Sequence, residues 1–515
     1  MPSQLVRRAV LFVAAAALTL AFAGTASAAT YVVLYKAQGV PTNGGATVRA
    51  AGGTVVASYA QIGVIIAKSD NAGFRAALMK DKSVDGVSTT VGFAGRLEPD
   101  AAASSEGNLP NAPATDADTF SGLQWDMRQI HTPEAHAITG GSPAVLVGDI
   151  DTGIDFDHPD LAANIDVANS VNCVSGAPVP GLAAQDDNGH GTHTAGTIAG
   201  AANGVGIVGV APNVKVAGIK SGNADGFFFP EAVICGFVWA GSHHMDVTNN
   251  SYFADPWEYN CKNDAEQHAI WKAEQRAIKF AQQEGVLVVA AEGNDSDDTA
   301  HPTTDITSPD DTTPVERSIT NACVIIPVEI SGVVGVSATG SFGQGTDAGQ
   351  YPDHLKSFYS SYGVGVTDLT APGGDSLFGT PPFTGTAGRV LSAWPTEVTA
   401  NCLAPRRKFD PAAPGALWCY QQGTSMATPH VVGVAALIIS RYGKTSGGKT
   451  SMNPGTVASY LQQTADPQAC PDELPLGYAA ILGFNSGLAQ ECQGGPGSNS
   501  WYGKGEVDAL NAVTR

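Results

Sequence analysis

Short apolar runs alternate with longer stretches of helical periodicity through most of this chain. Runs with the length and composition of buried strands are 145–149, 215–219, 246–250, 286–291 and 332–337. Helical periodicity covers 190–201, 230–240, 266–284 and 424–442. Because parallel strands need crossover connections, this alternation predicts an α/β fold in which helices cover both faces of a parallel β-sheet.

A smaller unit with a different pattern precedes this region. Its expected strands are 30–35, 54–59, 62–67 and 84–91, the middle two joined by a tight turn, and its expected helix is 71–80. Residues 97–119 are rich in Ala, Pro, Asp and Ser without periodicity, which is typical of a linker. We therefore expect a small α+β domain at 29–96 and a large domain at 120–515.

The first residues have the order of a secretory signal peptide. Arg7 and Arg8 precede the apolar run 9–23, and an A-x-A cleavage site follows at 26–28. The run is too short to span a bilayer comfortably. We expect residues 1–28 to be removed during general export, although the paired arginines also suggest the twin-arginine route. The mature protein is then expected outside the cell, with no membrane association.

Charge and cysteine content narrow the range of binding partners and indicate disulfide bonds. The 515 residues carry a formal net charge of −21 at pH 7, which favours solubility and opposes binding to nucleic acids or anionic membranes. Eight cysteines in an exported chain indicate up to four disulfides, whose pairing spacing alone cannot fix. The pairs that we favour are Cys402–Cys419, Cys470–Cys492, Cys261–Cys323 and Cys173–Cys235. The first two would close short loops, the third would join two insertions, and the fourth is what remains.

A serine in the stretch 423–430 is the first candidate for chemistry. It stands among small residues, directly before an apolar helical pattern at 431–437. Ser425 is therefore expected near the start of a buried helix, where unpaired backbone N–H groups and the helix dipole favour an oxyanion. A hydroxyl is a weak nucleophile until a base takes its proton, so a base must lie nearby in the fold.

Two upstream segments supply the base and its partner. Asp151 follows a buried apolar strand and is expected at the strand tip, half shielded, where a carboxylate can orient an imidazole. His190 opens a helix of small residues, and the glycines beside it allow close approach of backbone or substrate. The order along the chain is Asp, His, Ser, which matches one of the known orders of a Ser-His-Asp triad.

The segments DTGID, GHGTHTAG and GTSMATPHVVG resemble the motifs of the subtilisin-like serine peptidases. The resemblance extends over about 124–513, with insertions at 252–264, 295–325 and 400–420. It implies that Asp151 orients the imidazole, His190 acts as general base and then acid, and Ser425 attacks the carbonyl. It also implies a subtilisin-like fold and a serine endopeptidase that hydrolyses proteins or peptides without an organic cofactor.

The resemblance also assigns groups around the scissile bond. Asn294, at the end of a β-branched run, is implied to donate its amide to the oxyanion; the alternative is a turn residue. The residues implied to bind substrate are Gly226, Phe227, Asn250, Ser251, Tyr252, Ala291 and Gly293. The first two would belong to an edge strand that pairs with the substrate backbone, although they can equally be loop residues.

Two positions depart from the family pattern beside the cleft. Phe253 stands where the family usually has glycine, and Glu292 stands where it has a small residue. These changes leave the side-chain specificity open. They also keep open the hypothesis of a catalytically silent secreted binding protein on the same fold. A serine esterase is a weaker alternative, because the serine lacks the G-x-S-x-G elbow.

A structural calcium ion is the cofactor that the resemblance allows. Asp160 matches a calcium-ligating position of the family, and Asn203 lies in the loop that supplies further oxygen ligands. A second candidate is the acidic set Asp295, Asp297, Asp298, Asp305, Asp310 and Asp311, for which a solvated loop is the preferred interpretation. The spacing of His190 and His193 also suggests zinc, but no third ligand accompanies them.

The small domain at 29–96 resembles the inhibitory pro-domain of secreted subtilisins. That resemblance implies an intramolecular chaperone and temporary inhibitor, which a slowly folding parallel sheet would benefit from. Maturation cleavage is then expected within the linker at 97–119 or just before it. The alternative is a free-standing binding module. The mature enzyme is expected to be a monomer.

Overall fold

The computed structural model describes residues 28–90, 111–342, 354–478, 490–495 and 497–515. Its centre is an eight-stranded sheet in which the strands are parallel except at one edge, where β6 and β7 are antiparallel. In spatial order the strands are β16 (Thr367–Pro372), β15 (Val334–Thr339), β11 (Leu287–Ala291), β9 (Val247–Asn250), β5 (Leu146–Asp151), β8 (Lys215–Lys220), β6 (Val171–Asn172) and β7 (Val179–Pro180). The expected α/β architecture is therefore confirmed.

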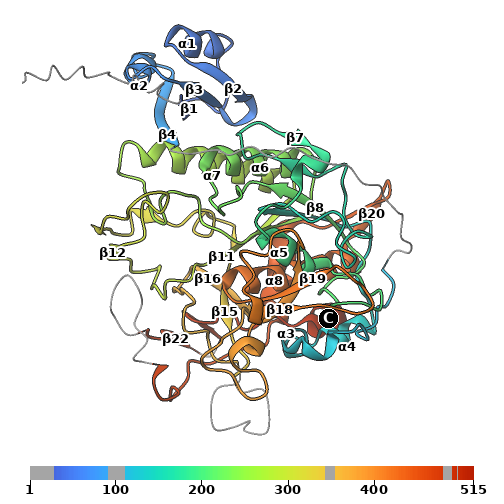
Figure 1. The fold of residues 1–515 in the computed structure, drawn as a ribbon. Helices are drawn as coiled ribbons and strands as arrows, with labels where there is room; N and C mark the ends of the chain where they lie inside the picture. Colours follow the sequence, from blue (N-terminus) through green and yellow to red (C-terminus); the bar gives the residue numbers. More distant parts are fainter. Residues whose placement is uncertain (1–27, 91–110, 343–353, 479–489, 496) are drawn as a thin grey trace, which may run out of the picture.

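Helices cover both faces of this sheet (Figure 1). One face packs on α5 (His190–Ala199) and α8 (Thr424–Tyr442), and the other on α6 (Pro230–Ser242) and α7 (Gln267–Gln283). Strand β11 shows how the two faces of the sheet are buried. Its residues Leu287 and Val289 join the core beside α8, whereas Val288 and Ala290 join the core beside α6 and α7. Successive side chains of a strand point to opposite faces, so a continuous apolar run suits a sheet buried on both sides.

Further elements surround this centre. The remaining helices of this domain are α3 (Trp125–Gln129), α4 (Thr132–His136), α9 (Pro454–Thr464) and α10 (Ala509–Thr514). A separate three-stranded sheet has the order β17 (Val390–Trp394), β19 (Leu417–Gln421), β18 (Arg407–Lys408). The two-stranded ribbons are β10 (Asn260–Cys261) with β14 (Cys323–Val324), β12 (Thr304–Asp305) with β13 (Arg317–Ser318), β20 (Lys444–Ser446) with β21 (Lys449–Ser451), and β22 (Gly494–Gly495) with β23 (Ser498–Asn499).

The N-terminal unit is a separate antiparallel sheet. Its elements are β1 (Ala29–Tyr35), α1 (Gly44–Ala50), β2 (Thr54–Tyr59), β3 (Val64–Ser69), α2 (Phe74–Leu78) and β4 (Val84–Thr90), with the strand order β2-β3-β1-β4. The middle two strands pair as predicted, and a single 3₁₀ turn, Ala60–Ile62, joins them, so β3 starts at Val64, later than expected. The helix near residues 71–80 is also shorter than predicted, and α1 was not predicted.

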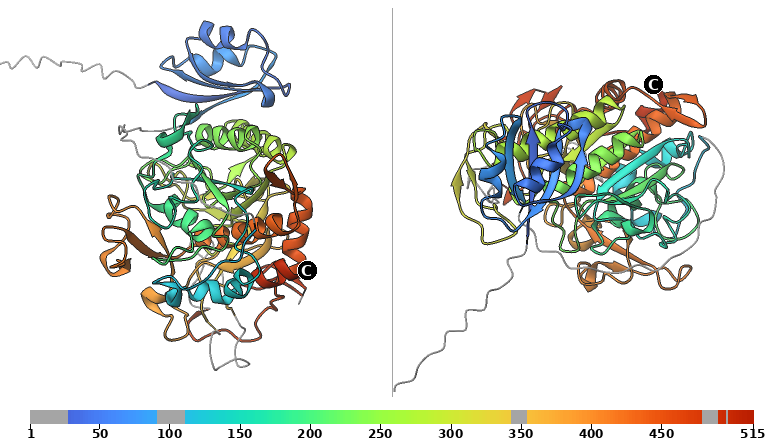
Figure 2. Two further views of the ribbon diagram at one scale, coloured as in Figure 1. Left: turned by 90° about the vertical axis from the view of Figure 1, so that its right-hand side faces the viewer. Right: turned by 90° about the horizontal axis from the view of Figure 1, so that it is seen from above.

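This unit lies against α7 of the large domain (Figures 1 and 2). Two ion pairs cross the interface, Arg75–Glu266 and Lys272–Asp85, each at 2.5 Å. Arg276 of α7 also donates a hydrogen bond to the carbonyl oxygen of Tyr35 at 2.8 Å. Val32, Leu34 and Val64 also belong to the hydrophobic cluster that includes residues of α6 and α7, so the small domain is docked by apolar as well as charged and backbone contacts.

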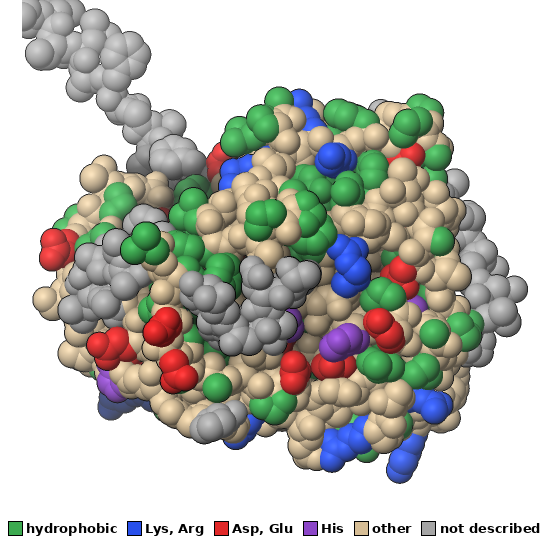
Figure 3. Space-filling view, turned by 90° about the horizontal axis from the view of Figure 1, so that it is seen from below, with side chains coloured by type: hydrophobic (Ala, Val, Ile, Leu, Met, Phe, Trp, Pro, Cys, Tyr) green, Lys and Arg blue, Asp and Glu red, His purple; other side chains and the backbone are tan. Residues whose placement is uncertain are grey.

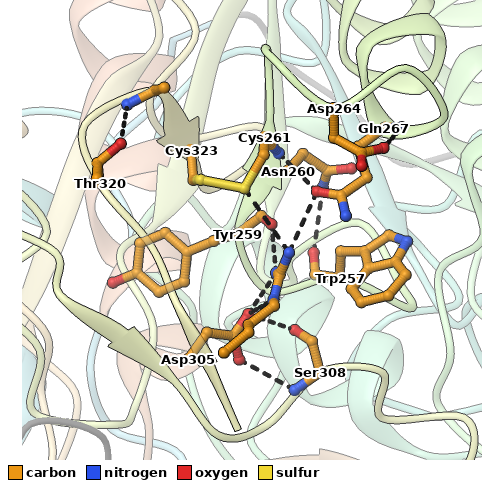
Figure 4. The surroundings of a disulfide bond; sticks show 12 residues. Trp257, Tyr259, Asn260, Cys261, Asp264, Gln267, Asp305, Ser308, Thr320 and Cys323 are labelled. Carbon is orange, nitrogen blue, oxygen red and sulfur yellow. Dashed lines mark hydrogen bonds and ion pairs between the residues drawn. A yellow bond between two sulfur atoms is a disulfide. The ribbon is translucent and has the colours of Figure 1, made fainter. Parts of the chain in front are cut away.

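The four favoured disulfides are all present: Cys173–Cys235, Cys261–Cys323, Cys402–Cys419 and Cys470–Cys492. The second of them joins β10 to β14, and the side chains of Trp257, Tyr259 and Asp305 lie around it (Figure 4). It therefore ties together the two insertions at 252–264 and 295–325, as predicted.

Acidic side chains are dispersed over the face seen from below, among basic and hydrophobic ones (Figure 3). Within the described ranges no helix is long and apolar enough to cross a membrane. The predicted signal peptide at 1–28 lies, apart from its last residue, outside the described residues, and so does most of the predicted linker.

Candidate active site

Ser425 lies at the start of α8, as its sequence context predicts. It is the second residue of the helix. Gly423, whose φ is 156°, precedes the first residue of the helix. The Ser425 hydroxyl donates a hydrogen bond to the carbonyl oxygen of Ser251 at 3.0 Å, and the Ser251 hydroxyl donates to the carbonyl oxygen of Ser425 at 2.9 Å. These reciprocal bonds join the helix start to the end of β9.

Asp151 and His190 form a pair beside this serine. Asp151 is the last residue of β5 and His190 is the first residue of α5, and His190 Nδ1 lies 2.8 Å from Asp151 Oδ1. The same carboxylate oxygen accepts a hydrogen bond from the Thr152 N–H at 2.8 Å. Asp151 is fully buried rather than half shielded as expected, because the cleft wall closes over the strand tip. A fixed, buried carboxylate can hold an imidazole in one orientation.

The electrostatics favour a charged imidazole at His190. Burial lowers its pKa, but the charge and hydrogen bond of Asp151, with Asp149 and Asp186 further away, raise it, and the net pKa lies above the ordinary value. Asp149 lies buried beside Asp151 and accepts hydrogen bonds from Asn249 and Thr194, each at 2.9 Å. Burial and the neighbouring Asp151 raise the pKa of Asp149 well above its usual range.

The raised pKa of His190 predicts the acid limb of the pH profile. A general base must be deprotonated, so hydrolysis should rise with pH as His190 loses its proton. Because the folded-state pKa is raised, the midpoint of kcat/KM is expected above about 6.5, the ordinary value for histidine. Steady-state kinetics on a neutral peptide between pH 5 and 9 measures it. A midpoint below the ordinary value would contradict the prediction.

Ser425 and His190 face one cavity of about 260 Å³. In the present rotamer the hydroxyl is turned to the Ser251 carbonyl, so a change of rotamer must bring it to the imidazole before a proton can pass. Catalytic hydrogen bonds often form fully only when substrate is bound. The parallel strands β5, β9 and β11 all end at this edge of the sheet, which is where ligands bind in open α/β folds.

Asn294 is positioned with its amide carbonyl already engaged. Its Oδ1 accepts hydrogen bonds from the Thr424 N–H at 2.8 Å and the Thr424 hydroxyl at 3.1 Å. Asn294 is exposed and lines the cavity together with Ser425. Since the oxygen is fixed against α8, the NH₂ group is the part of the side chain that can donate to a ligand.

Six of the seven predicted substrate-binding residues line the cavity: Gly226, Phe227, Ser251, Tyr252, Ala291 and Gly293. Asn250 does not line it, and that prediction is wrong. Its amide donates to the carbonyl oxygen of Val289 at 2.9 Å inside the sheet. Asn250 is the last residue of β9, and bonds to the neighbouring strand hold its side chain inside the sheet, whereas the residues after the strand end line the cavity.

The predicted edge strand at 226–228 is not formed. Gly226 has φ of +92° and the segment runs as a loop into the cavity wall. Phe228 is buried and stacks on Tyr252 with ring centroids 4.2 Å apart. Of the two departures from the family pattern, only Phe253 lines the cavity. Glu292 is fully buried and accepts hydrogen bonds from the Thr367 hydroxyl at 2.7 and 2.9 Å, behind the cleft.

The predicted calcium site at Asp160 and Asn203 is partly engaged by hydrogen bonds. Asp160 Oδ2 accepts hydrogen bonds from the Ile207 N–H at 3.0 Å and the Trp418 indole N–H at 2.6 Å. Asn203 Oδ1 accepts one from the Val205 N–H at 3.0 Å. Asp160 Oδ1, in contrast, is buried and has no hydrogen-bond donor among the described residues, so this oxygen is open to a cation. The calcium ion therefore stays a prediction.

The acidic set between 295 and 311 is not a solvated loop throughout. Asp305 is fully buried and pairs with Arg317, whereas Asp298 pairs with His301 at 2.8 Å. Asp295 and Asp310 line the cavity beside Ser425, as do Asp255 and Glu258. The sequence interpretation gave no role in the cleft to any of these four. In the part of the chain that the structure describes, no three His, Cys, Asp or Glu side chains are grouped so that they could hold a metal ion.

Comparison with known proteins places this site in a family. A model described as the subtilase family matches residues 142–505. Subtilisin BL of Lederbergia lenta is 28% identical over 318 residues, 61% of this chain and 84% of that protein. Fervidolysin of Fervidobacterium pennivorans is 27% identical over 364 residues, 69% of this chain and 42% of that protein. The epidermin leader peptide processing serine protease of Staphylococcus aureus has a TM-score of 0.63 at 22% identity, covering 94% of this chain and 98% of that chain, and this likeness shows the fold alone.

Proposed function

Because this chain belongs to the subtilase family and is a subtilisin-like serine endopeptidase, we propose that Asp151, His190 and Ser425 are its catalytic triad. The observation that carries the proposal is the 2.8 Å contact between Asp151 and His190 beside a serine at a helix start, within one cavity. His190 takes the proton of Ser425 as the hydroxyl attacks the scissile carbonyl, and then gives it to the leaving amine. Water hydrolyses the acyl-enzyme by the reverse steps. No cofactor takes part in this chemistry.

Two donors stabilise the tetrahedral intermediate in this proposal. They are the Asn294 amide, whose carbonyl end is held by Thr424, and the backbone N–H of Ser425 at the start of α8. Preorganised donors of this kind cost no reorganisation when the negative charge develops. The Asp151 carboxylate stabilises the imidazolium that forms on His190.

The proposal extends to the precursor. Residues 1–28 direct export, 29–96 act as chaperone and inhibitor, 97–119 hold the maturation cleavage, and 120–515 form the monomeric extracellular enzyme. The folded N-terminal sheet and its ion pairs with α7 support this division. The substrates are proteins or peptides, and the proposal includes neither a nucleic acid nor a membrane partner. A structural calcium ion at Asp160 and Asn203 remains part of the proposal, with the unpartnered Asp160 Oδ1 as the oxygen open to it.

Covalent labelling tests the proposed function directly. The secreted mature protein is treated with phenylmethylsulfonyl fluoride while hydrolysis of denatured casein is followed. We expect activity to fall in step with the attachment of one sulfonyl group, which peptide mapping finds on Ser425. The N-terminus of the same preparation should lie within or just before 97–119. Hydrolysis that persists after complete treatment, or label on another residue alone, would refute the assignment.

Replacement of Asn294 by alanine should lower kcat by about 100- to 1,000-fold with a small change in KM. The amide donates to charge that exists only in the transition state, so substrate binding is largely spared. Asn294→Asp separates loss of the oxyanion donor from loss of the contact with Thr424. Aspartate keeps an acceptor for the Thr424 N–H but presents no N–H donor to the oxyanion. It should be at least as slow as Asn294→Ala. Asn321→Ala, at an exposed asparagine, serves as the control, and wild-type kcat in Asn294→Ala would exclude the oxyanion role.

A further inference from the structure

We infer that the enzyme cleaves after a basic residue, arginine or lysine, whose side chain enters the cavity beside Ser425 and meets the carboxylates of Asp255, Glu258, Asp295 and Asp310. The inference rests on the proposed function and deepens it. The residue in question is the one whose carbonyl carbon Ser425 attacks, here called the acyl-side residue.

The cavity joins the catalytic groups and the carboxylates in one space. Its wall includes Ser425, His190 and Asn294, and four acidic side chains complete it: Asp255, Glu258, Asp295 and Asp310. No lysine or arginine lines the cavity. A substrate held with its carbonyl at Ser425 therefore places its acyl-side residue next to four carboxyl groups and no lysine or arginine.

These carboxylates come from two insertions that flank the catalytic motifs. Asp255 and Glu258 follow β9 directly, and they are only 4% and 1% exposed. Asp295 follows Asn294 in sequence, and Asp310 lies further along the same insertion. The disulfide Cys261–Cys323 ties the two insertions together, which fixes the acidic wall against the cleft.

The basic side chain of the neighbouring insertion points elsewhere. Arg317, a base of the same insertion, is bound to Asp305 and to the carbonyl oxygen of Tyr259, and does not line the cavity. Asp310 Oδ1 is shielded from solvent and has no hydrogen-bond donor among the described residues. Burial, followed by the nearby Asp310, raises the pKa of Asp255 well above its usual range. A guanidinium or ammonium group would supply both the missing donor and the opposing charge.

The remaining wall suits the aliphatic part of such a side chain. Phe253 and the stacked pair Phe228 and Tyr252 line the same cavity. Lysine and arginine pack their methylene groups on apolar surface while the charged end meets polar partners. A divalent metal ion suits the wall less well, since no three acidic groups of the described residues are arranged to hold one.

Hydrolysis of matched peptides tests the inference. The mature enzyme is given fluorogenic peptides that differ only in the acyl-side residue: Arg, Lys, Leu, Phe or Glu. We expect kcat/KM for Arg or Lys to exceed that for Leu by roughly ten- to a hundredfold, as a charge-assisted hydrogen bond provides. Asp310→Asn and Glu258→Gln should each reduce this ratio severalfold, chiefly by lowering kcat/KM for the Arg and Lys peptides. Asp298→Asn removes a charge from the same insertion outside the cavity, and should leave the ratio unchanged.

The outcomes separate this inference from the proposed function. Equal or better hydrolysis of the Leu or Phe peptide by an enzyme that is labelled at Ser425 would overturn the basic specificity and leave the peptidase assignment intact. Absence of labelling and of all hydrolysis would overturn both. Competitive inhibition by benzamidine, an aromatic amidinium, gives a measurement on the wild type that needs no variant, and failure to compete would contradict the acidic pocket. Thermal melting with added Ca²⁺ or EDTA is the last check: a Ca²⁺-dependent shift that Asp310→Asn abolishes would show that the wall binds metal instead.

Discussion

Replacement of Ser425 by alanine should lower kcat by roughly a millionfold and leave the precursor uncleaved. The hydroxyl is the nucleophile of the proposed mechanism, and the cavity offers no second serine hydroxyl in its place: Ser251, the other serine that lines it, donates its proton to the Ser425 carbonyl oxygen. The residual rate should reflect binding and the oxyanion donors alone. Peptide hydrolysis measures kcat, and the N-terminus of the secreted product reports processing.

The same variant decides whether maturation is self-catalysed. Wild-type protein should lose residues 29 to about 110, whereas Ser425→Ala should keep the N-terminal domain docked on α7 through pairs such as Lys272–Asp85. Ser459→Ala, at a half-buried serine of α9 away from the cavity, is the control and should mature normally. Trimming of the Ser425→Ala precursor at the wild-type site, in a host without other extracellular peptidases, would disprove self-processing.

Local pattern was enough to predict the framework of the site. The apolar periodicity after Gly423 predicted α8 with its observed bounds, because a helix buried among strands needs apolar side chains over most of its surface. The end of β11 at Ala291 was also predicted, since buried strands read as continuous apolar runs, whereas β5 continues two residues beyond its predicted end to Asp151. Motifs at strand ends and helix starts therefore carry much of the candidate site.

The orientation of single side chains was harder to predict. Asn250 lies in a motif that lines the cleft, yet its side chain is held inside the sheet by the carbonyl oxygen of Val289 on the neighbouring strand. Glu292 was expected beside the cleft and instead reaches Thr367 of β16, a partner distant in sequence. In both cases the deciding contacts are long-range and leave no local pattern.

The acidic wall of the cavity was missed for the same reason. Asp255 and Asp310 come from separate insertions, and only the folded chain brings them to one cavity. From the sequence, the acidic residues between 295 and 311 were interpreted as a solvated loop or a calcium site. A run of carboxylates has no periodicity that would mark it as the wall of a pocket. One signal was available, namely that the favoured disulfide Cys261–Cys323 would bring the two insertions together.

Replacement of Asp151 by asparagine should lower kcat by roughly 10⁴-fold while the fold is kept. The Thr152 N–H donates a hydrogen bond to Asp151 Oδ1. The amide oxygen of an asparagine can occupy the same position and still accept a hydrogen bond from His190 Nδ1. What the variant loses is the charge that stabilises the imidazolium. Asp151 also raises the pKa of His190, so its removal should move the acid limb of kcat/KM to lower pH. Peptide kinetics from pH 5 to 9 measures both effects, and a melting curve confirms that the variant is folded. An unchanged acid limb in a slow but folded variant would mean that Asp151 acts on structure alone. A wild-type kcat would remove Asp151 from the triad.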